Sequence, residues 1–248
     1  MRDFTVKAYK QLLSSIKTTG VEVYGVAKWF KEKPKKGILL RHDIDRKPQN
    51  ALQIAELEND YNIKSTYYFR TVGRVFQPEI IRQISSLEHE IGYHYEDLSL
   101  AKGNYEIAEK LFRMHLEKFR TLVKVETIAM HGRPFSPYDN RDLWRKYNCK
   151  DFGVLAEAFL DVDYSDMYYL TDTGRTWGQT KANIRDNVRN SLTADVDSTD
   201  SLISFIADNA DKKIALVMHP ERWEDKPTRW AIQYFRDVGA NIIKGFVK

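Results

Sequence analysis

Short apolar stretches alternate along the chain with longer segments in which apolar residues recur every three or four positions. The short stretches have the length of buried β-strands, and the longer ones have the period of amphipathic helices. The predicted strands are Gly37–Asp45, Lys64–Thr71, Glu90–Tyr95, Glu126–His131, Asp151–Ala156, Met167–Asp172 and Lys213–His219. Because strands that alternate with helices pair in parallel, we predict an α/β fold. About seven parallel strands would form a distorted or incomplete (β/α) barrel.

The helical segments between these strands complete the predicted domain. They begin near Ala51, at Pro78, near Tyr105 and at Pro227, and proline is well tolerated in a first helical turn. We expect the last helix to stop near Gly239. Its predicted inward face consists of Trp230, Ala231, Tyr234, Phe235 and Val238. We treat residues 1–248 as one catalytic domain in which residues 1–36 form a helical segment packed on the barrel.

Polar side chains gather where the predicted strands end. Asp43 and Asp45 close the first strand on the same face, because strand side chains alternate, and a buried unpaired carboxylate would be costly. At or just past the ends of other strands lie His94, His131, Asp172 and His219. In β/α barrels this rim is where sites are built. The pattern therefore predicts a metal ligand beside a general base at the carboxyl rim.

The other histidines and one loop are predicted to serve different purposes. We expect His42 and His115 to be hydrogen-bonded within the structure and His89 to be solvated or to cap an element. Residues 173–199 lack a clean period, so we expect a long functional loop or lid there.

Composition and charge exclude several classes of protein. With 39 basic and 35 acidic residues interleaved, the net charge of +4 gives no basic block of the kind that binds nucleic acid. The single cysteine, Cys149, excludes an internal disulfide and a cysteine-based zinc cluster. No apolar run approaches the roughly 18 residues of a membrane span, and the first residues do not form a signal peptide. We expect a soluble cytoplasmic protein whose oligomeric state the sequence does not indicate.

Three fragments resemble motifs of the polysaccharide deacetylase superfamily, carbohydrate esterase family 4. The run His42-Asp-Ile-Asp45 resembles the first motif in an Asp-x-Asp form. Glu90–His94 resembles the second motif, and Leu216–His219 resembles the late histidine motif. The resemblance extends from about Gly37 to the C-terminus. It implies a distorted seven-stranded (β/α) barrel and a metal-dependent hydrolase that removes an acyl group, in the first place N-acetyl, from a sugar.

The resemblance also assigns roles to individual residues. It implies that Asp43 is the general base, that Asp45 and His94 are metal ligands, and that His219 is the general acid. The cofactor would be a divalent metal, with zinc the commonest choice, which brings the pKa of its bound water nucleophile toward about 7. Asp172 could hold a catalytic residue in place or merely cap a turn.

The chain departs from the family pattern at the second motif. A further histidine is expected there, but the position is Leu98, which cannot coordinate a metal. His131 is the preferred third ligand, since imidazole completes a His₂Asp set, and Asp97 or Glu96 are the alternatives. Arg133, which loosely matches the family's arginine-proline motif, is an expected substrate contact. We also expect Arg175, Trp177 and Trp223 to contact substrate, although aromatic residues near a barrel mouth often serve only in packing.

Three functions remain open at this point. The first is deacylation of a carbohydrate, such as a nucleotide-linked or lipid-linked precursor of a surface polysaccharide. The second is hydrolysis of a C–N bond in a cyclic amide or ureide, which the Asp-x-Asp form also resembles. The third is a barrel that lost its metal with the missing histidine and now binds a glycan or a partner protein.

Overall fold

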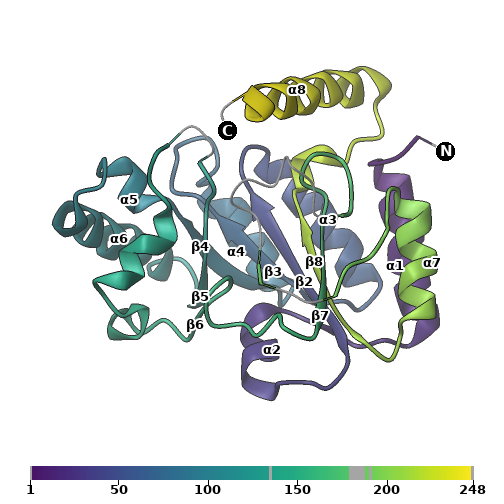
Figure 1. The fold of residues 1–248 in the computed structure, drawn as a ribbon, viewed down its shortest axis with the longest axis horizontal. Helices are drawn as coiled ribbons and strands as arrows, with labels where there is room; N and C mark the ends of the chain where they lie inside the picture. Colours follow the sequence, from purple (N-terminus) through teal and green to yellow (C-terminus); the bar gives the residue numbers. More distant parts are fainter. Residues whose placement is uncertain (1, 134–135, 179–187, 190–191, 247–248) are drawn as a thin grey trace.

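The computed structural model describes residues 2–133, 136–178, 188–189 and 192–246, and within them one parallel sheet holds eight strands. The strands are β1 Val23–Tyr24, β2 Gly37–Ile44, β3 Thr66–Phe69, β4 Glu90–Tyr95, β5 Val125–Met130, β6 Ala156–Glu157, β7 Met167–Thr171 and β8 Lys213–Met218. Seven of them follow the order β6-β5-β4-β3-β2-β8-β7, and β1 pairs with the start of β2. The sheet curls into a half-barrel that stays open between β6 and β7 (Figure 1). The predicted fold class is confirmed.

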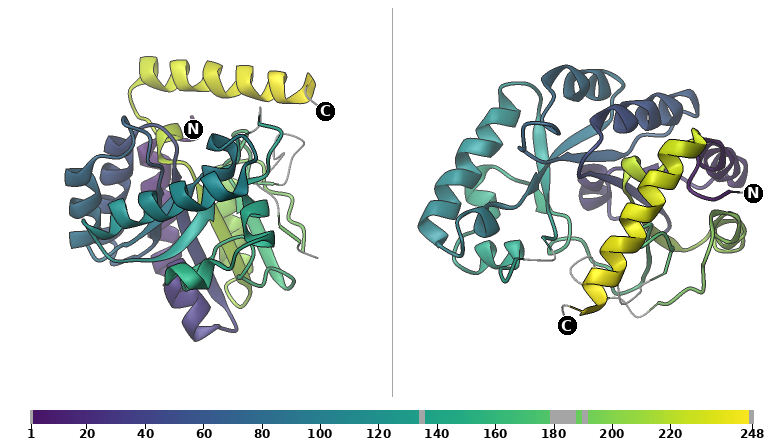
Figure 2. Two further views of the ribbon diagram at one scale, coloured as in Figure 1. Left: turned by 90° about the vertical axis from the view of Figure 1, so that its left-hand side faces the viewer. Right: turned by 90° about the horizontal axis from the view of Figure 1, so that it is seen from above.

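Helices cover the outside of this sheet (Figure 2). They are α1 Val6–Thr19, α2 Val26–Glu32, α3 Pro48–Asp60, α4 Pro78–Ser86, α5 Asp97–Leu100, α6 Tyr105–Arg120, α7 Thr199–Asp208 and α8 Pro227–Phe246. Short 3₁₀ helices are η1 Asn140–Arg145, η2 Cys149–Phe152 and η3 Pro220–Arg222. Helix α1 lies beside α7, and α8 crosses above the carboxyl ends of the strands (Figure 1). Among the described helices, none combines the length and the apolarity that a bilayer crossing requires.

Strand β2 lies at the centre of the fold and is buried at all eight positions. A parallel strand covered on both faces is normally apolar throughout. The first part of β2 follows that rule, but its last four residues include Arg41, His42 and Asp43. Three polar side chains in a fully buried strand need partners; Arg41 and Asp43 pair with each other at the site described below, and His42 pairs with Glu58 in the scaffold.

Two predicted elements differ from the structure. The strand predicted at Asp151–Ala156 is mostly wrong, because η2 ends at Gly153, whose φ of 68° is left-handed, and β6 contains only Ala156 and Glu157. Helix α8 does not stop at Gly239 and continues to Phe246.

The predicted inward face of α8 is only partly correct. Trp230 is partly buried and donates to the Asp3 carbonyl at 2.8 Å, and Ala231 and Val238 are also partly buried. Gln233 and Asp237 are its buried residues, whereas Phe235 is 71% exposed and Tyr234 is 39% exposed. The helix crosses the polar rim of the barrel and not its apolar flank, so the usual direction of amphipathic packing is reversed.

Candidate metal centre and catalytic rim

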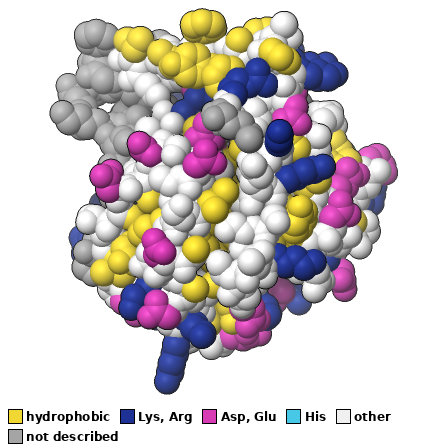
Figure 3. Space-filling view, turned by 90° about the vertical axis from the view of Figure 1, so that its right-hand side faces the viewer, with side chains coloured by type: hydrophobic (Ala, Val, Ile, Leu, Met, Phe, Trp, Pro, Cys, Tyr) yellow, Lys and Arg dark blue, Asp and Glu magenta, His cyan; other side chains and the backbone are white. Residues whose placement is uncertain are grey.

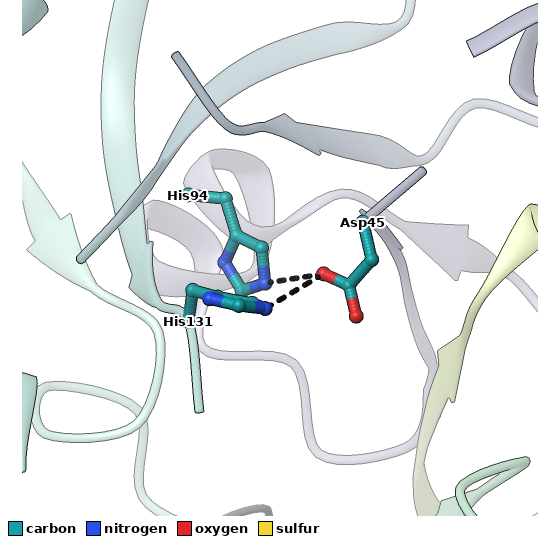
Figure 4. Close-up of side chains that lie close together, drawn as sticks. All are labelled: Asp45, His94 and His131. Atoms are coloured by element: carbon teal, nitrogen blue, oxygen red, sulfur yellow. Dashed lines mark ion pairs between the residues drawn. The ribbon is translucent and has the colours of Figure 1, made fainter. Parts of the chain in front are cut away.

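Asp45, His94 and His131 lie together at the carboxyl rim (Figure 4). Asp45 directly follows β2, His94 is in β4, and His131 directly follows the neighbouring β5. Asp45 Oδ1 is 3.5 Å from His94 Nε2 and 3.3 Å from His131 Nε2. One ligand atom from each residue lies within 4.8 Å of the other two, so the three side chains can grip a common ion.

The far nitrogen of each imidazole determines how the ring is turned. His94 Nδ1 is 2.9 Å from the carbonyl oxygen of Ala129, and His131 Nδ1 is 3.2 Å from Glu96 Oε2. Both oxygens can only accept, so each Nδ1 carries a hydrogen and donates it. In the neutral form of either ring, the lone pair of Nε2 faces the Asp45 carboxylate, as it must in a metal ligand.

Two neutral rings in this position would repel the carboxylate unless a cation lay between them. Burial would lower the pKa of His131, but without a cation Asp45 and Glu96 outweigh burial and raise that pKa, so its ring can take up a proton instead. Asp45 Oδ1 is buried and has no hydrogen-bond partner among the described residues. Two imidazole nitrogens and one carboxylate oxygen form a donor set typical of zinc with open positions. The residues therefore fit a divalent metal ion.

The carboxyl group of Asp45 is held in its ionised form. Burial alone would raise its pKa, but the neighbouring His131 and His94 outweigh burial and keep the pKa well below its usual range. A ligand to a cation must be deprotonated, so the environment favours the metal-binding form.

Glu96 orients His131 by accepting a hydrogen bond from its Nδ1, the ring nitrogen that faces away from Asp45. Its Oε1 accepts hydrogen bonds from Arg70 Nε at 2.9 Å and from a terminal nitrogen of Arg70 at 2.7 Å. Burial would raise the pKa of Glu96, but His131 and Arg70 lower it to about 2. A metal-binding histidine is commonly oriented by a carboxylate on its other nitrogen, which is the position of Glu96.

The structure separates the three candidates for the third ligand. Asp97 accepts hydrogen bonds from Tyr93 at 2.8 Å and from His115 Nδ1 at 2.7 Å. Glu96 contacts the far nitrogen of His131, and Leu98 is buried. Only His131 of the three contacts Asp45.

We expect Glu96→Gln to weaken zinc affinity about 10- to 100-fold, because the neutral amide no longer fixes the His131 ring or attracts Arg70. Zinc affinity would be measured by competition with a chromogenic chelator. Glu117→Gln is the matched control, since Glu117 also pairs with an arginine but lies exposed on α6. If the wild type, Glu96→Gln and Glu117→Gln bound zinc with equal affinity, Glu96 would not be needed to position His131.

Asp43 lies beside this trio and is held by Arg41. A terminal nitrogen of Arg41 is 3.3 Å from Asp43 Oδ2, and both side chains are almost fully buried. The same oxygen is 3.9 Å from His94 Nε2. Asp43 Oδ1 is buried and has no hydrogen-bond partner among the described residues.

Asp172 and His219 form a second polar cluster, where the adjacent strands β7 and β8 end. His219 Nδ1 is 2.7 Å from Asp172 Oδ1, and the His219 backbone N–H donates to Asp172 Oδ2 at 2.9 Å. Arg222 and the indole N–H of Trp223 also donate to this carboxylate, at 3.2 Å each. Four donors make Asp172 the anchor of His219 and not simply a turn cap.

The surroundings of the His219 imidazole favour its protonated form. Burial and the nearby Arg222 would lower its pKa, but Asp172 and Asp45 outweigh them and raise the pKa to about 9. Burial alone would raise the pKa of Asp172, but Arg222 and His219 outweigh it and lower the pKa, which favours the ionised carboxylate. Asp45, a residue of the candidate metal centre, is among the charges that raise the pKa of His219.

The residues expected to contact substrate lie in different places. Arg133 is partly exposed, lies 3.5 Å from Glu96 Oε2, and lines a cavity of about 400 Å³ with His131, Lys102 and Tyr138. Arg175 is instead buried and donates to Asp237 at 2.9 Å.

Both tryptophans are packed in the core, contrary to expectation. Trp177 is 0% and Trp223 is 1% exposed, and Phe4 stacks on Trp177 with ring centroids 6.0 Å apart. A ring without an exposed face cannot stack on a sugar. The N-terminal segment covers these rings, which local periodicity could not reveal.

The remaining histidines are all part of the scaffold. His42 Nε2 is 2.7 Å from Glu58 Oε1, and His115 bonds to Asp97, so both expectations are confirmed. The expectation for His89 was wrong: it is buried, and its Nδ1 accepts from the Ser65 N–H at 3.2 Å.

Sequence reasoning missed Arg41 and Arg222. The signal for Arg41 was present, since a cation two residues before Asp43 on one strand lies on the same face. Arg222 follows His219 after a proline, and no periodicity predicts its contact with Asp172.

Fold and site together define a parallel half-barrel with a candidate metal centre at its carboxyl rim. No protein-family model matches the sequence, and no curated protein matches it. A solved structure that it resembles is the crystal structure of a mutant of a CE4 family pseudoenzyme with restored enzymatic activity. The two are 15% identical with a TM-score of 0.44, over 85% of this chain and 64% of that one. A likeness of this degree carries no information on activity.

Proposed function

We propose that the chain is a metal-dependent hydrolase that removes an acyl group, in the first place N-acetyl, from a sugar or a sugar-containing precursor. The observation that carries the proposal is the convergence of His94 Nε2 and His131 Nε2 on Asp45 Oδ1. Asp43 and a protonated His219 lie at the same rim, so a base and an acid accompany the candidate metal centre.

The residues divide the chemistry of amide hydrolysis between them. A divalent ion bound by Asp45, His94 and His131 would supply a Lewis acid for the acyl carbonyl and for water. Asp43, held by Arg41, would accept the proton of the water that attacks the carbonyl carbon. His219 would donate its proton to the departing nitrogen, because an amine leaves poorly as an anion. Asp172 would keep that imidazole oriented and charged.

The cavity beside His131 is where we place the sugar. Arg133 and Lys102 give it a positive lining, which favours an anionic carrier such as a nucleotide or lipid diphosphate. The buried tryptophans are not part of this proposal.

Acetate release from N-acetylated substrates tests the function. We expect the zinc-loaded protein to release acetate from a nucleotide-linked or oligomeric N-acetyl sugar. Treatment with a chelator should stop the reaction, and added zinc should restore it. Ring opening of a cyclic imide without acetate release would favour the second function, and zinc binding without either reaction would favour a binding protein.

The pH profile tests the role of His219. Despite burial, Asp172 and Asp45 raise the pKa of His219 from 6.5 to about 9 in the metal-free protein. A divalent ion at Asp45 would offset the contribution of Asp45, so we expect kcat to fall on the alkaline side of neutral pH. Asp172→Asn removes the anion that raises this pKa, so the falling limb should move at least about one unit lower. If kcat fell but the pH at which the alkaline limb begins did not change, Asp172 would have only a structural role.

The same pair should contribute to stability with a defined sign. A folded-state pKa above the unfolded value stabilises the fold fully below about pH 6.5, and the contribution disappears as the pH rises through about 9. Thermal unfolding of the wild type and Asp172→Asn should therefore differ more at pH 6 than at pH 10.

A further inference from the structure

Helix α8 turns a polar side toward the barrel. Gln233 and Asp237 are its buried residues, and Asp237 accepts hydrogen bonds from Arg175 Nε and Gln233 Nε2, each at 2.9 Å. Arg46, just past β2, lies 3.6 Å from the same carboxylate. Polar contacts therefore fix this helix above the rim (Figure 2).

The opposite side of α8 is apolar and uncovered. Ile232 is 57%, Phe235 is 71% and Ile242 is 56% exposed. Together with Gly239, they recur at steps of three and four residues, which places them on one stripe of the helix. Figure 3 shows hydrophobic side chains along this edge of the molecule. A helix normally buries such a stripe, so its exposure indicates an interaction surface.

The charges around this stripe distinguish between partners. Arg229 and Arg236 are exposed, whereas Asp237, the acidic residue of α8, is buried against Arg175. Every charge exposed by the described side chains of α8 is therefore positive. An apolar stripe bordered by arginines is typical of a helix that lies in the interface of an anionic bilayer.

The same charges disfavour a second copy as the partner. A two-fold pairing of α8 centred on Phe235 would bring the adjacent Arg236 residues of both copies close together. Like charges across such an interface are destabilising.

We propose that the exposed face of α8 docks the protein on an anionic membrane surface. Because α8 follows η3, which itself follows His219, docking would hold the carboxyl rim close to the lipid headgroups. The substrate would then be an acylated sugar carried on a membrane lipid, an extension that rests on the proposed function. The docking itself depends on neither metal nor catalysis.

Co-sedimentation with vesicles tests the docking. We expect the full-length protein to bind phosphatidylcholine vesicles containing a quarter phosphatidylglycerol, and to bind pure phosphatidylcholine at least fivefold more weakly. Phe235→Ser and Arg236→Glu should each weaken binding to the anionic vesicles at least fivefold. Ile107→Ser is the matched control, since Ile107 is 50% exposed on α6, away from α8, and should leave binding unchanged.

Three outcomes would overturn the proposal. The first is the absence of binding to anionic vesicles, and the second is an equal loss of binding in the Ile107→Ser control. The third is a wild-type dimer that Phe235→Ser converts to a monomer in light scattering, which would make the face an interface between copies. Zinc affinity of Phe235→Ser, and vesicle binding by the metal-free protein, separate a failure of docking from a failure of the proposed hydrolase.

Discussion

His131→Ala is expected to lower the affinity of the protein for Zn²⁺ by at least about a hundredfold, more than the loss of a residue that only orients a ligand. The substitution removes one of three donor atoms around Asp45 Oδ1 and leaves only His94 and Asp45. Two donors cannot provide the set of protein ligands that zinc sites commonly have. Competition with a chelator of known affinity measures the change, and acetate release should be lost at zinc concentrations that saturate the wild type.

His115→Ala is the matched control for this substitution. The two imidazoles are similarly buried, with side-chain exposures of 12% for His131 and 15% for His115, and each bonds to a carboxylate. His115 does not contact Asp45 in the described structure, so its loss should leave zinc affinity within a few-fold of the wild type. An unchanged zinc affinity in His131→Ala would show that His131 is not a metal ligand. It would favour a barrel that no longer uses a metal.

Asp43→Asn is expected to lower kcat on the order of a thousandfold, within the range for loss of a general base. Asparagine keeps the shape of the side chain and can still contact Arg41, but its amide cannot accept the proton of the attacking water. Because Asp43 does not belong to the ligand trio, zinc affinity should stay within a few-fold of the wild type. Steady-state kinetics and chelator competition on one preparation measure both quantities.

Asp97→Asn provides the comparison for this second variant. Asp97 is a fully buried acidic residue that bonds to Tyr93 and His115 and does not belong to the ligand trio. Its substitution should cost stability and leave kcat largely intact. If Asp43→Asn kept more than a tenth of the wild-type kcat, another group would have to serve as the base.

Much of the fold could be predicted from the sequence because strand and helix periods are local. Six of the seven predicted strands occur within about two residues of their expected ends, and β4 matches at both ends. The strand predicted at Asp151–Ala156 failed because Gly153 ends a 3₁₀ turn there. The side of α8 that faces the rest of the protein could not be predicted. A periodic stripe shows that a helix is amphipathic but not which of its sides packs against the protein.

The candidate site could also be predicted only in part. Because parallel strands end at one rim, the sequence predicted that Asp45, His94 and His131 lie at the same edge of the sheet, and the structure places them in contact. The choice between His131, Asp97 and Glu96 depended on side-chain directions after the strands end, which only tertiary packing determines. The burial of Trp177 and Trp223 likewise depends on Phe4, which is far from both in sequence. The lid predicted for residues 173–199 lies partly outside the described residues, and its role stays a prediction.

The most direct measurement is X-ray diffraction from a zinc-soaked crystal, recorded on both sides of the zinc absorption edge. The account predicts one strong anomalous peak at the carboxyl rim, about 2.0–2.2 Å from Asp45 Oδ1, His94 Nε2 and His131 Nε2. A crystal without that peak, or with zinc bound only by other side chains, would contradict the metal centre and the hydrolytic function that depends on it.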